Sequence, residues 1–154
     1  MPSPTSFLIA GGTGRQGGAV VNALLTDNST SIQPKDIYVL TRNAAGAAAV
    51  ALATRGVKLV HGELGQPDAI FKQLEAQGVS PTSTAAFLAQ AHGPTELSDA
   101  KGFIDAAITN GLSYFVYSSV DRGGPELSDR DASYCKTFSD KFQIEKRSEE
   151  HTSE

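Results

Sequence analysis

The chain has 154 residues, of which 40% are hydrophobic and 19% are charged, a balance typical of a globular domain. Its net charge of −4 argues against direct binding of nucleic acid or anionic membranes, and the single cysteine, Cys135, excludes an internal disulfide framework. No apolar run approaches the roughly 18 residues of a membrane span, and the first residues lack the basic start of a signal peptide. We therefore expect a cytoplasmic protein, with the nucleus as a second location.

Short apolar runs alternate with segments of helical spacing along the chain. The runs predict buried strands at residues 6–10, 37–41, 57–60, 85–89 and 114–118. The other segments predict helices at 15–27 and 44–54, from Pro67, from a cap at Thr95 to Asn110, and from near Tyr134 after a loop at 122–131. Strands that are apolar throughout are covered on both faces. The predicted fold class is therefore α/β, a doubly wound parallel Rossmann sheet of order 3-2-1-4-5, with a ligand crevice at the carboxyl ends of strands 1 and 4.

A glycine-rich loop joins the first predicted strand to the first predicted helix. Gly11, Gly14 and Gly17 have the spacing in which the first glycine allows a tight turn, the second lets the backbone approach a pyrophosphate, and the third lets the helix pack closely. The positive end of the helix dipole also favours an anion there. The context predicts a dinucleotide site rather than a plain turn. The other loop residues that we expect to hold the pyrophosphate are Gly12, Thr13, Arg15 and Gln16.

An arginine follows the second predicted strand, where NAD-selective sites carry an acidic residue that binds the ribose 2′-hydroxyl. The sequence there is Thr41-Arg42-Asn43, and no acidic residue lies between Asp36 and Glu63. A guanidinium at this position suits a 2′-phosphate, so we predict NADP(H) as the cofactor. One charge-assisted contact of about 1.5–3 kcal/mol would favour NADP over NAD by roughly 10- to 150-fold. The alternative is a solvated arginine at the end of a strand.

Several motifs together resemble the NmrA-like family of atypical short-chain dehydrogenases/reductases. They are GGTGRQGG at residues 11–18, VLTRN at 39–43, the segment 57–67, YFVYSSV at 114–120, and the segment 138–145. The resemblance implies that Thr41 and Arg42 lie at the phosphate and that the chain passes the adenine at Glu63 and Leu64, although the family usually has Asp where Glu63 stands. It also implies that Lys141 reaches the nicotinamide ribose.

The resemblance implies two kinds of function. Some family members are NADPH-dependent reductases, whereas others bind the dinucleotide without turnover and act as redox sensors through protein partners. Reductases of the wider class use Tyr-x-x-x-Lys on one helix, where the ammonium lowers the pKa of the phenol. That pair is absent here, because Thr137 stands four residues before Lys141. Ser119, like Ser118, remains a candidate to hydrogen-bond a carbonyl or the nicotinamide ribose.

The missing tyrosine places a regulatory, redox-sensing dinucleotide binder ahead of the alternatives. The first alternative is an NADPH-dependent oxidoreductase acting on a small carbonyl compound or a quinone, with Lys141 and Ser119 as the catalytic candidates. The second is an interaction domain whose nucleotide loop binds nothing. No metal site is expected, because His61 and His92 have no partners at ligand spacing.

The end of the chain departs from the family pattern. By resemblance, family members are about twice as long, so residues 1–146 correspond to the N-terminal part of the dinucleotide-binding domain, and the C-terminal part of the fold is expected to be missing. Residues 147–154, RSEEHTSE, resemble the translation of a widely used sequencing-library adapter. We therefore expect the natural sequence to stop near Lys146 and the last eight residues to be an artefactual tail.

Overall fold

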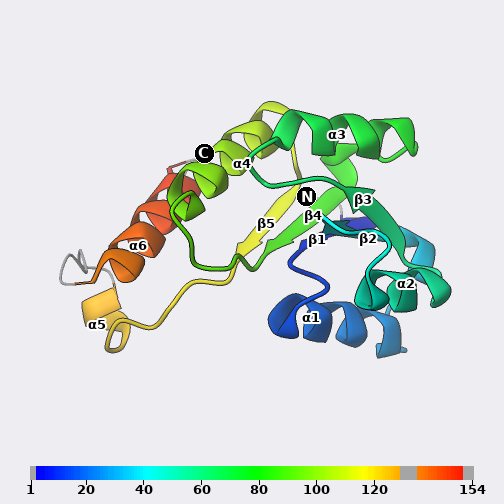
Figure 1. Cartoon of the computed structure of the whole chain (residues 1–154), viewed down its shortest axis with the longest axis horizontal. Helices are drawn as coiled ribbons and strands as arrows, with labels where there is room; N and C mark the ends of the chain where they lie inside the picture. The colour runs from blue at the N-terminus through cyan, green and yellow to red at the C-terminus, as the bar shows by residue number, and fades with distance from the viewer. Residues whose placement is uncertain (1–2, 129–134, 151–154) are drawn as a thin grey trace.

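The computed structural model describes residues 3–128 and 135–150. Its centre is one parallel sheet with the strand order β3-β2-β1-β4-β5 (Figure 1), which confirms the predicted Rossmann order. The strands are β1 (Ser6–Ala10), β2 (Ile37–Thr41), β3 (Lys58–His61), β4 (Thr84–Leu88) and β5 (Tyr114–Tyr117). Because all five run in the same direction, their carboxyl ends meet at one edge of the sheet, where the chain turns toward each following helix.

Helices cover both faces of the sheet. They are α1 (Arg15–Thr26), α2 (Ala47–Thr54), α3 (Pro67–Ala76), α4 (Glu96–Thr109), α5 (Pro125–Ser128) and α6 (Lys136–Glu149), with short 3₁₀ turns at Pro34–Asp36 and Pro81–Ser83. Helices α1 and α2 lie on one face and α3 and α4 on the other, with α6 packed beside α4 (Figure 1). One core cluster fills each interface between helices and sheet.

Some details differ from the prediction. Helix α2 begins at Ala47, because the chain first makes a turn in which the Gly46 N–H donates to the Asn43 carbonyl. Thr95 occupies the N-cap position of α4 but makes no side-chain cap; its carbonyl accepts from the Asp99 N–H instead. The short helix α5 interrupts the loop predicted at 122–131, and the last helix begins at Lys136, whereas Tyr134 lies outside the described residues.

The segment that resembles an adapter starts inside α6. Arg147 is helical, and its guanidinium contacts Asp105 of α4 at 2.7 Å and Glu150 at 2.7 Å. These contacts show where residues 147–150 lie and say nothing of their origin, so the artefactual tail remains a prediction. Its last four residues, 151–154, lie outside the described part of the chain.

Phe103 of α4 is fully buried between two aromatic neighbours. Its ring stacks on Phe71 of α3 at 5.8 Å and lies 6.2 Å from the ring of Phe115 of β5. These two ring contacts join α3, α4 and β5, and so fix the position of α4 on its face of the sheet.

We expect Phe103→Ala to lower the free energy of unfolding by about 3–5 kcal/mol, because it removes buried ring contacts and leaves a cavity. Urea unfolding followed by circular dichroism measures the change. Ile108→Ala is the control on the same helix; its side chain is 40% exposed, so the substitution should cost less than about 1 kcal/mol. Equal losses for both variants would contradict this packing.

Candidate functional site

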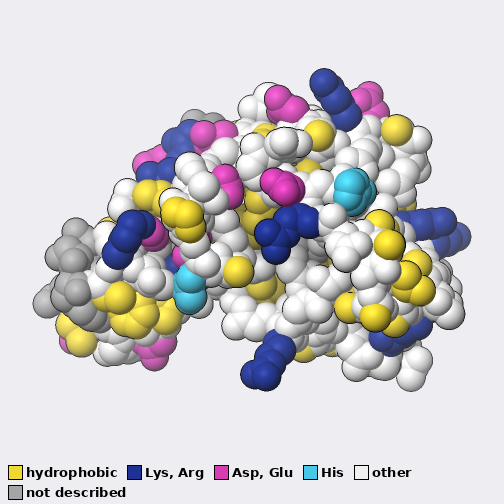
Figure 2. All heavy atoms as spheres, in the orientation of Figure 1, with side chains coloured by type: hydrophobic (Ala, Val, Ile, Leu, Met, Phe, Trp, Pro, Cys, Tyr) yellow, Lys and Arg dark blue, Asp and Glu magenta, His cyan; other side chains and the backbone are white. Residues whose placement is uncertain are grey.

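A cavity of about 690 Å³ opens at the carboxyl ends of the strands, within the range usual for small-molecule sites. Its walls come from the glycine loop, the end of β2, the loop after β3 and the segment between β4 and α4. In the middle of the face shown in Figure 2, basic and acidic side chains lie next to one another. The cavity therefore occupies the crevice that the strand order predicts.

The glycine loop is shaped by two close approaches. Gly11 has a φ of +83°, and a Cβ there would lie 2.3 Å from the Ala89 carbonyl oxygen after β4. A Cβ on Gly17 would lie 2.3 Å from the Gly11 carbonyl oxygen. Side chains at either position would push apart the loop, α1 and the β4 segment. Gly14 is the N-cap of α1 and lines the cavity, whereas Gly12 packs beneath the loop against Val39.

The polar residues of the loop face the cavity. Thr13, Arg15 and Gln16 all line it and are exposed. The first turn of α1 contains no acidic residue, so nothing there offsets the positive end of the helix dipole. The Ser118 hydroxyl, just after β5, donates to the Gln16 Oε1 at 2.8 Å. This bond ties the carboxyl end of β5 to the start of α1.

Hydrogen bonds from neighbouring residues fix the backbone at the end of the cavity where Arg42 lies. The Arg42 carbonyl accepts from the Nε2 of His61, 3.0 Å away, while Gln73 bonds to the backbone of His61. Thr41 lines the cavity beside Arg42, and its Oγ1 accepts from the Asn43 N–H. Within residues 3–128 and 135–150, no ion pair involves either Arg42 or Arg15, so both guanidinium groups are available to an anion.

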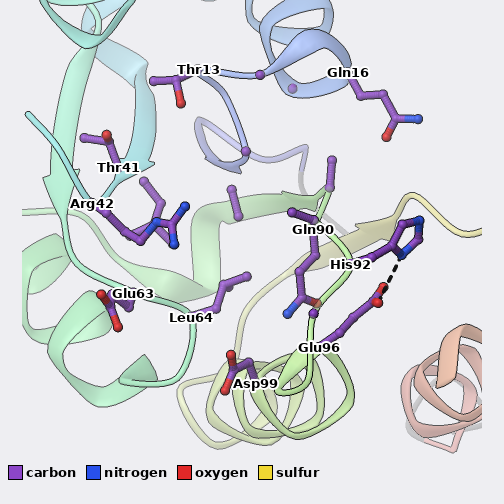
Figure 3. A pocket seen from close by; sticks show the side chains of 18 of the residues that line it. Thr13, Gln16, Thr41, Arg42, Glu63, Leu64, Gln90, His92, Glu96 and Asp99 are labelled. Atoms are coloured by element: carbon purple, nitrogen blue, oxygen red, sulfur yellow. Dashed lines mark hydrogen bonds and ion pairs between the residues drawn. The ribbon is translucent and has the colours of Figure 1, made fainter. Parts of the chain in front are cut away.

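Glu63 and Leu64 line the cavity near Arg42 (Figure 3); the adenine contact that the resemblance implies for them stays a prediction. Leu64 is half-buried and packs on the core, which leaves an apolar wall for a flat ring. Gln90, after β4, also lines the cavity; its Oε1 is buried and finds no hydrogen-bond donor among the described residues. Such an acceptor is costly unless a ligand supplies the donor.

The opposite end of the cavity holds a linked set of charged groups that the sequence did not predict. Glu96, at the start of α4, is 2% exposed and lines the cavity. Its Oε1 lies 3.1 Å from the Nζ of Lys141, and its Oε2 accepts from the Nδ1 of His92 at 3.1 Å (Figure 3). The i,i+4 spacing of His92 and Glu96 was the one sequence signal for this set.

The fold also brings together a tyrosine and a lysine without the Tyr-x-x-x-Lys spacing. The Lys141 Nζ donates to the Tyr117 Oη at 3.3 Å, and the ammonium lies 5.3 Å from the centre of the tyrosine ring. Burial, and then the negative charge of Glu96, raise the pKa of Tyr117 well above its ordinary value. The phenol therefore stays protonated at neutral pH, and it gives up its proton less readily than an ordinary tyrosine.

Two candidate residues lie behind the cavity wall. Lys141 is buried against Glu96 and Tyr117, and neither it nor Ser119 is among the residues that line the cavity. Ser119 lies near Glu145 of α6, and its buried hydroxyl has no hydrogen-bond partner among the described residues. The ribose contact of Lys141 and the carbonyl contact of Ser119 therefore stay predictions.

Arg122 fastens the loop after β5 to α6. Its guanidinium is buried, donates to both carboxylate oxygens of Glu145 at 3.0 and 2.5 Å, and also donates to the Ser128 carbonyl. Burial opposes the ionisation of Glu145, but the hydrogen bonds from Arg122 and the charges of Arg122 and Lys146 outweigh it and hold its pKa below the ordinary value.

Among the described residues no group of His, Cys, Asp and Glu side chains is arranged to hold a metal ion. None of the helices described here is long and apolar enough to cross a membrane.

We expect the stability contributed by Glu145 to depend on pH. Because folding lowers its pKa, its ionised form stabilises the fold above the ordinary value of 4.5, and this contribution is lost as the pH falls through the folded pKa. Glu145→Gln should therefore lower the unfolding free energy at pH 7 and much less at pH 3, measured by urea unfolding at both. Glu75→Gln, an exposed site on α3, is the control. A pH-independent loss for Glu145→Gln would refute the ion pair with Arg122.

The comparisons with known proteins agree with this architecture. The model of the NmrA-like family matches residues 5–154. The NmrA-like family domain-containing oxidoreductase lnaB of Aspergillus flavus is 30% identical over 121 residues, covering 77% of this chain and 35% of that protein. The oxidoreductase notA of an Aspergillus species is 34% identical over 115 residues, covering 72% and 32%. The chain thus spans about a third of the length of these curated relatives.

Two solved structures share the fold at low identity. The leucoanthocyanidin reductase–NADPH complex of Vitis vinifera aligns with a TM-score of 0.65 at 21% identity, covering 94% of this chain and 44% of that one. The anaerobillin reductase ChuY of Escherichia coli O157:H7 aligns with a TM-score of 0.65 at 21% identity, covering 93% and 66%. The family match over residues 5–154, with the 30% identity to the oxidoreductase lnaB, shows that the chain belongs to the NmrA-like family.

Proposed function

We propose that the cavity binds NADP(H) and that the chain is the dinucleotide-binding part of an oxidoreductase. The observation that carries the proposal is the exposed Arg42 at the end of β2, which forms no ion pair with any described residue and lies in the same cavity as the glycine loop. A 2′-phosphate at Arg42 and a pyrophosphate at the start of α1 would each meet groups that the fold leaves available. The leucoanthocyanidin reductase of Vitis vinifera, which shares this fold, was solved as a complex with NADPH, and this supports the cofactor.

The residues present fit such a cofactor. Because Gly11 and Gly17 have no Cβ, the loop can pack closely against its neighbours. Gly14 lines the cavity at the N-terminus of α1. The buried Gln90 Oε1 has no hydrogen-bond donor among the described residues, and a bound ligand could provide one. When bound, the dinucleotide supplies hydride chemistry. The chain's part is to bind its phosphates, orient its rings and exclude water at the buried wall formed by Glu96.

A regulatory NADP(H) binder is the second candidate. It is favoured by the state of the Tyr117–Lys141 pair: the pKa of the phenol is raised, and Glu96 engages the ammonium that would otherwise lower it. The names of the curated relatives, which call them oxidoreductases, favour the first candidate. A carbonyl compound or a quinone is the substrate class proposed for a reductase, and a protein partner is proposed for a regulator. An interaction domain with no ligand would leave Arg42 and the glycine loop without a role.

We expect Arg42→Ala to weaken NADPH binding by about 10- to 150-fold, because one charge-assisted contact to the 2′-phosphate is lost. NADH, which lacks that phosphate, should bind the variant and the wild type alike. Isothermal titration calorimetry measures both. Arg55→Ala, which removes an exposed arginine at the end of α2, is the matched control and should leave NADPH binding unchanged. If Arg42→Ala weakens NADPH and NADH equally, Arg42 does not read the 2′-phosphate.

Absorbance at 340 nm separates the two candidate functions. Steady loss of NADPH with a carbonyl or quinone substrate, saturating with substrate concentration, is expected of an oxidoreductase. NADPH binding without such loss is expected of a regulator.

A further inference from the structure

We propose that Glu96 is a ligand-binding residue, and that its carboxylate, held by Lys141, accepts a hydrogen bond from the ribose diol of the nicotinamide half of the dinucleotide. This inference rests on the proposed binding of NADP(H). It assigns the ribose contact to an ion pair formed between two helices, in place of a lysine acting alone.

The position of Glu96 in the cavity is the first argument. Arg42 and Glu63 lie at one end of the cavity and His92 and Glu96 at the other, with the glycine loop between them (Figure 3). The two riboses of a dinucleotide lie on either side of its pyrophosphate. If the phosphorylated ribose lies at Arg42 and the pyrophosphate at the loop, the second ribose extends toward Glu96.

The chemistry of the ion pair is the second argument. Glu96 is 2% exposed and Lys141 is about as well buried, so both charges have lost most of their hydration. Although Oε1 lies 3.1 Å from the Lys141 Nζ, the pair lacks hydrogen-bond geometry, and this buried oxygen has no hydrogen-bond partner among the described residues. A ribose diol offers hydroxyl groups that donate and accept at once. It therefore matches a carboxylate that accepts and a nearby ammonium that donates.

A purely structural role explains less. Helices α4 and α6 already pack side by side, and Ile144 of α6 is fully buried in the same core cluster as Phe103 and Ile104 of α4. Burying an ion pair costs several kcal/mol per ion before the attraction offsets it. A pair placed at a cavity wall despite that cost is better explained by contact with a ligand.

His92 occupies the place that a ribose hydroxyl would take. Its Nδ1 donates to the Glu96 Oε2 at 3.1 Å, yet its side chain is 63% exposed. An exposed imidazole can turn away at small cost, and a hydroxyl can replace it as the donor. Tyr117 holds the other side of the set by accepting from the Lys141 Nζ at 3.3 Å, so the ammonium stays in place when His92 moves.

The test compares two ligands on the 154-residue chain by calorimetry. NADPH contains both riboses, whereas adenosine 2′,5′-bisphosphate contains only the ribose expected at Arg42. We expect Glu96→Gln to weaken NADPH about 10- to 100-fold, as for a lost hydrogen bond to a charged group, and to change the bisphosphate less than about 2-fold. Asp105→Asn, which removes an exposed acid of the same helix, is the matched control and should change neither.

A second variant guards against misfolding. Glu96→Gln leaves the Lys141 charge buried and unpaired, so E96Q/K141M removes both charges together, and circular dichroism checks its fold. The double variant should show the same selective loss of NADPH affinity. Equal weakening of both ligands, or no weakening of either, would overturn the inference while leaving the proposed function standing. If the wild-type chain binds neither ligand, the proposed function itself fails, and the inference fails with it.

Discussion

The contact between Gly17 and the carbonyl of Gly11 sets the geometry on which the site depends. A Cβ at Gly17 would lie 2.3 Å from that oxygen, so only glycine lets α1 begin this close to the end of β1. The first turn of α1 therefore directs its free N–H groups into the cavity. Because β1 and β4 are neighbours in the sheet, the same turn also brings the loop against the segment that leads to α4. A shift of α1 would change both walls at once.

The two ends of the cavity use charge in different ways. Arg15 and Arg42 are exposed and lie in no ion pair of the described chain. Because both guanidinium groups stay hydrated, they carry little desolvation cost in the free protein, and they form charge-assisted hydrogen bonds when an anion binds. Glu96 is a buried part of the cavity wall, and Lys141, which does not line the cavity, neutralises its charge, so this end is polar without net charge. This asymmetry suits a ligand with phosphates toward one end and an uncharged, hydroxyl-bearing sugar and ring toward the other.

The sequence predicts those parts of the fold and site that local patterns determine. The strand order follows from alternating apolar runs and the handedness of crossovers, and it is confirmed. The glycine loop and Arg42 are read from short segments, and the structure places both at the cavity, with Gly12 beneath the loop. Helix boundaries are harder to predict from the sequence. The start of α2 depends on a turn at Asn43 that competes with the helix, and composition does not reveal which of the two forms.

The charged set at the far end depends on packing between distant segments. Lys141 meets Glu96 and Tyr117 across 45 and 24 residues of sequence, because α6 packs beside α4 next to the end of β5. The Tyr-x-x-x-Lys pattern describes two residues of one helix, so no tyrosine of this sequence fits it and it cannot reveal a tyrosine contributed by a strand. Burial of Glu96 was equally hidden, since an acid in the first turn of a helix is ordinarily explained by the helix dipole.

The most direct test of the central claim is a crystal structure of the chain grown with NADP⁺. The account predicts the 2′-phosphate beside Arg42, the pyrophosphate on the N–H groups of the glycine loop, and the nicotinamide ribose at Glu96. A dinucleotide bound outside this cavity, or bound in the reverse direction with the nicotinamide at Arg42, would contradict it.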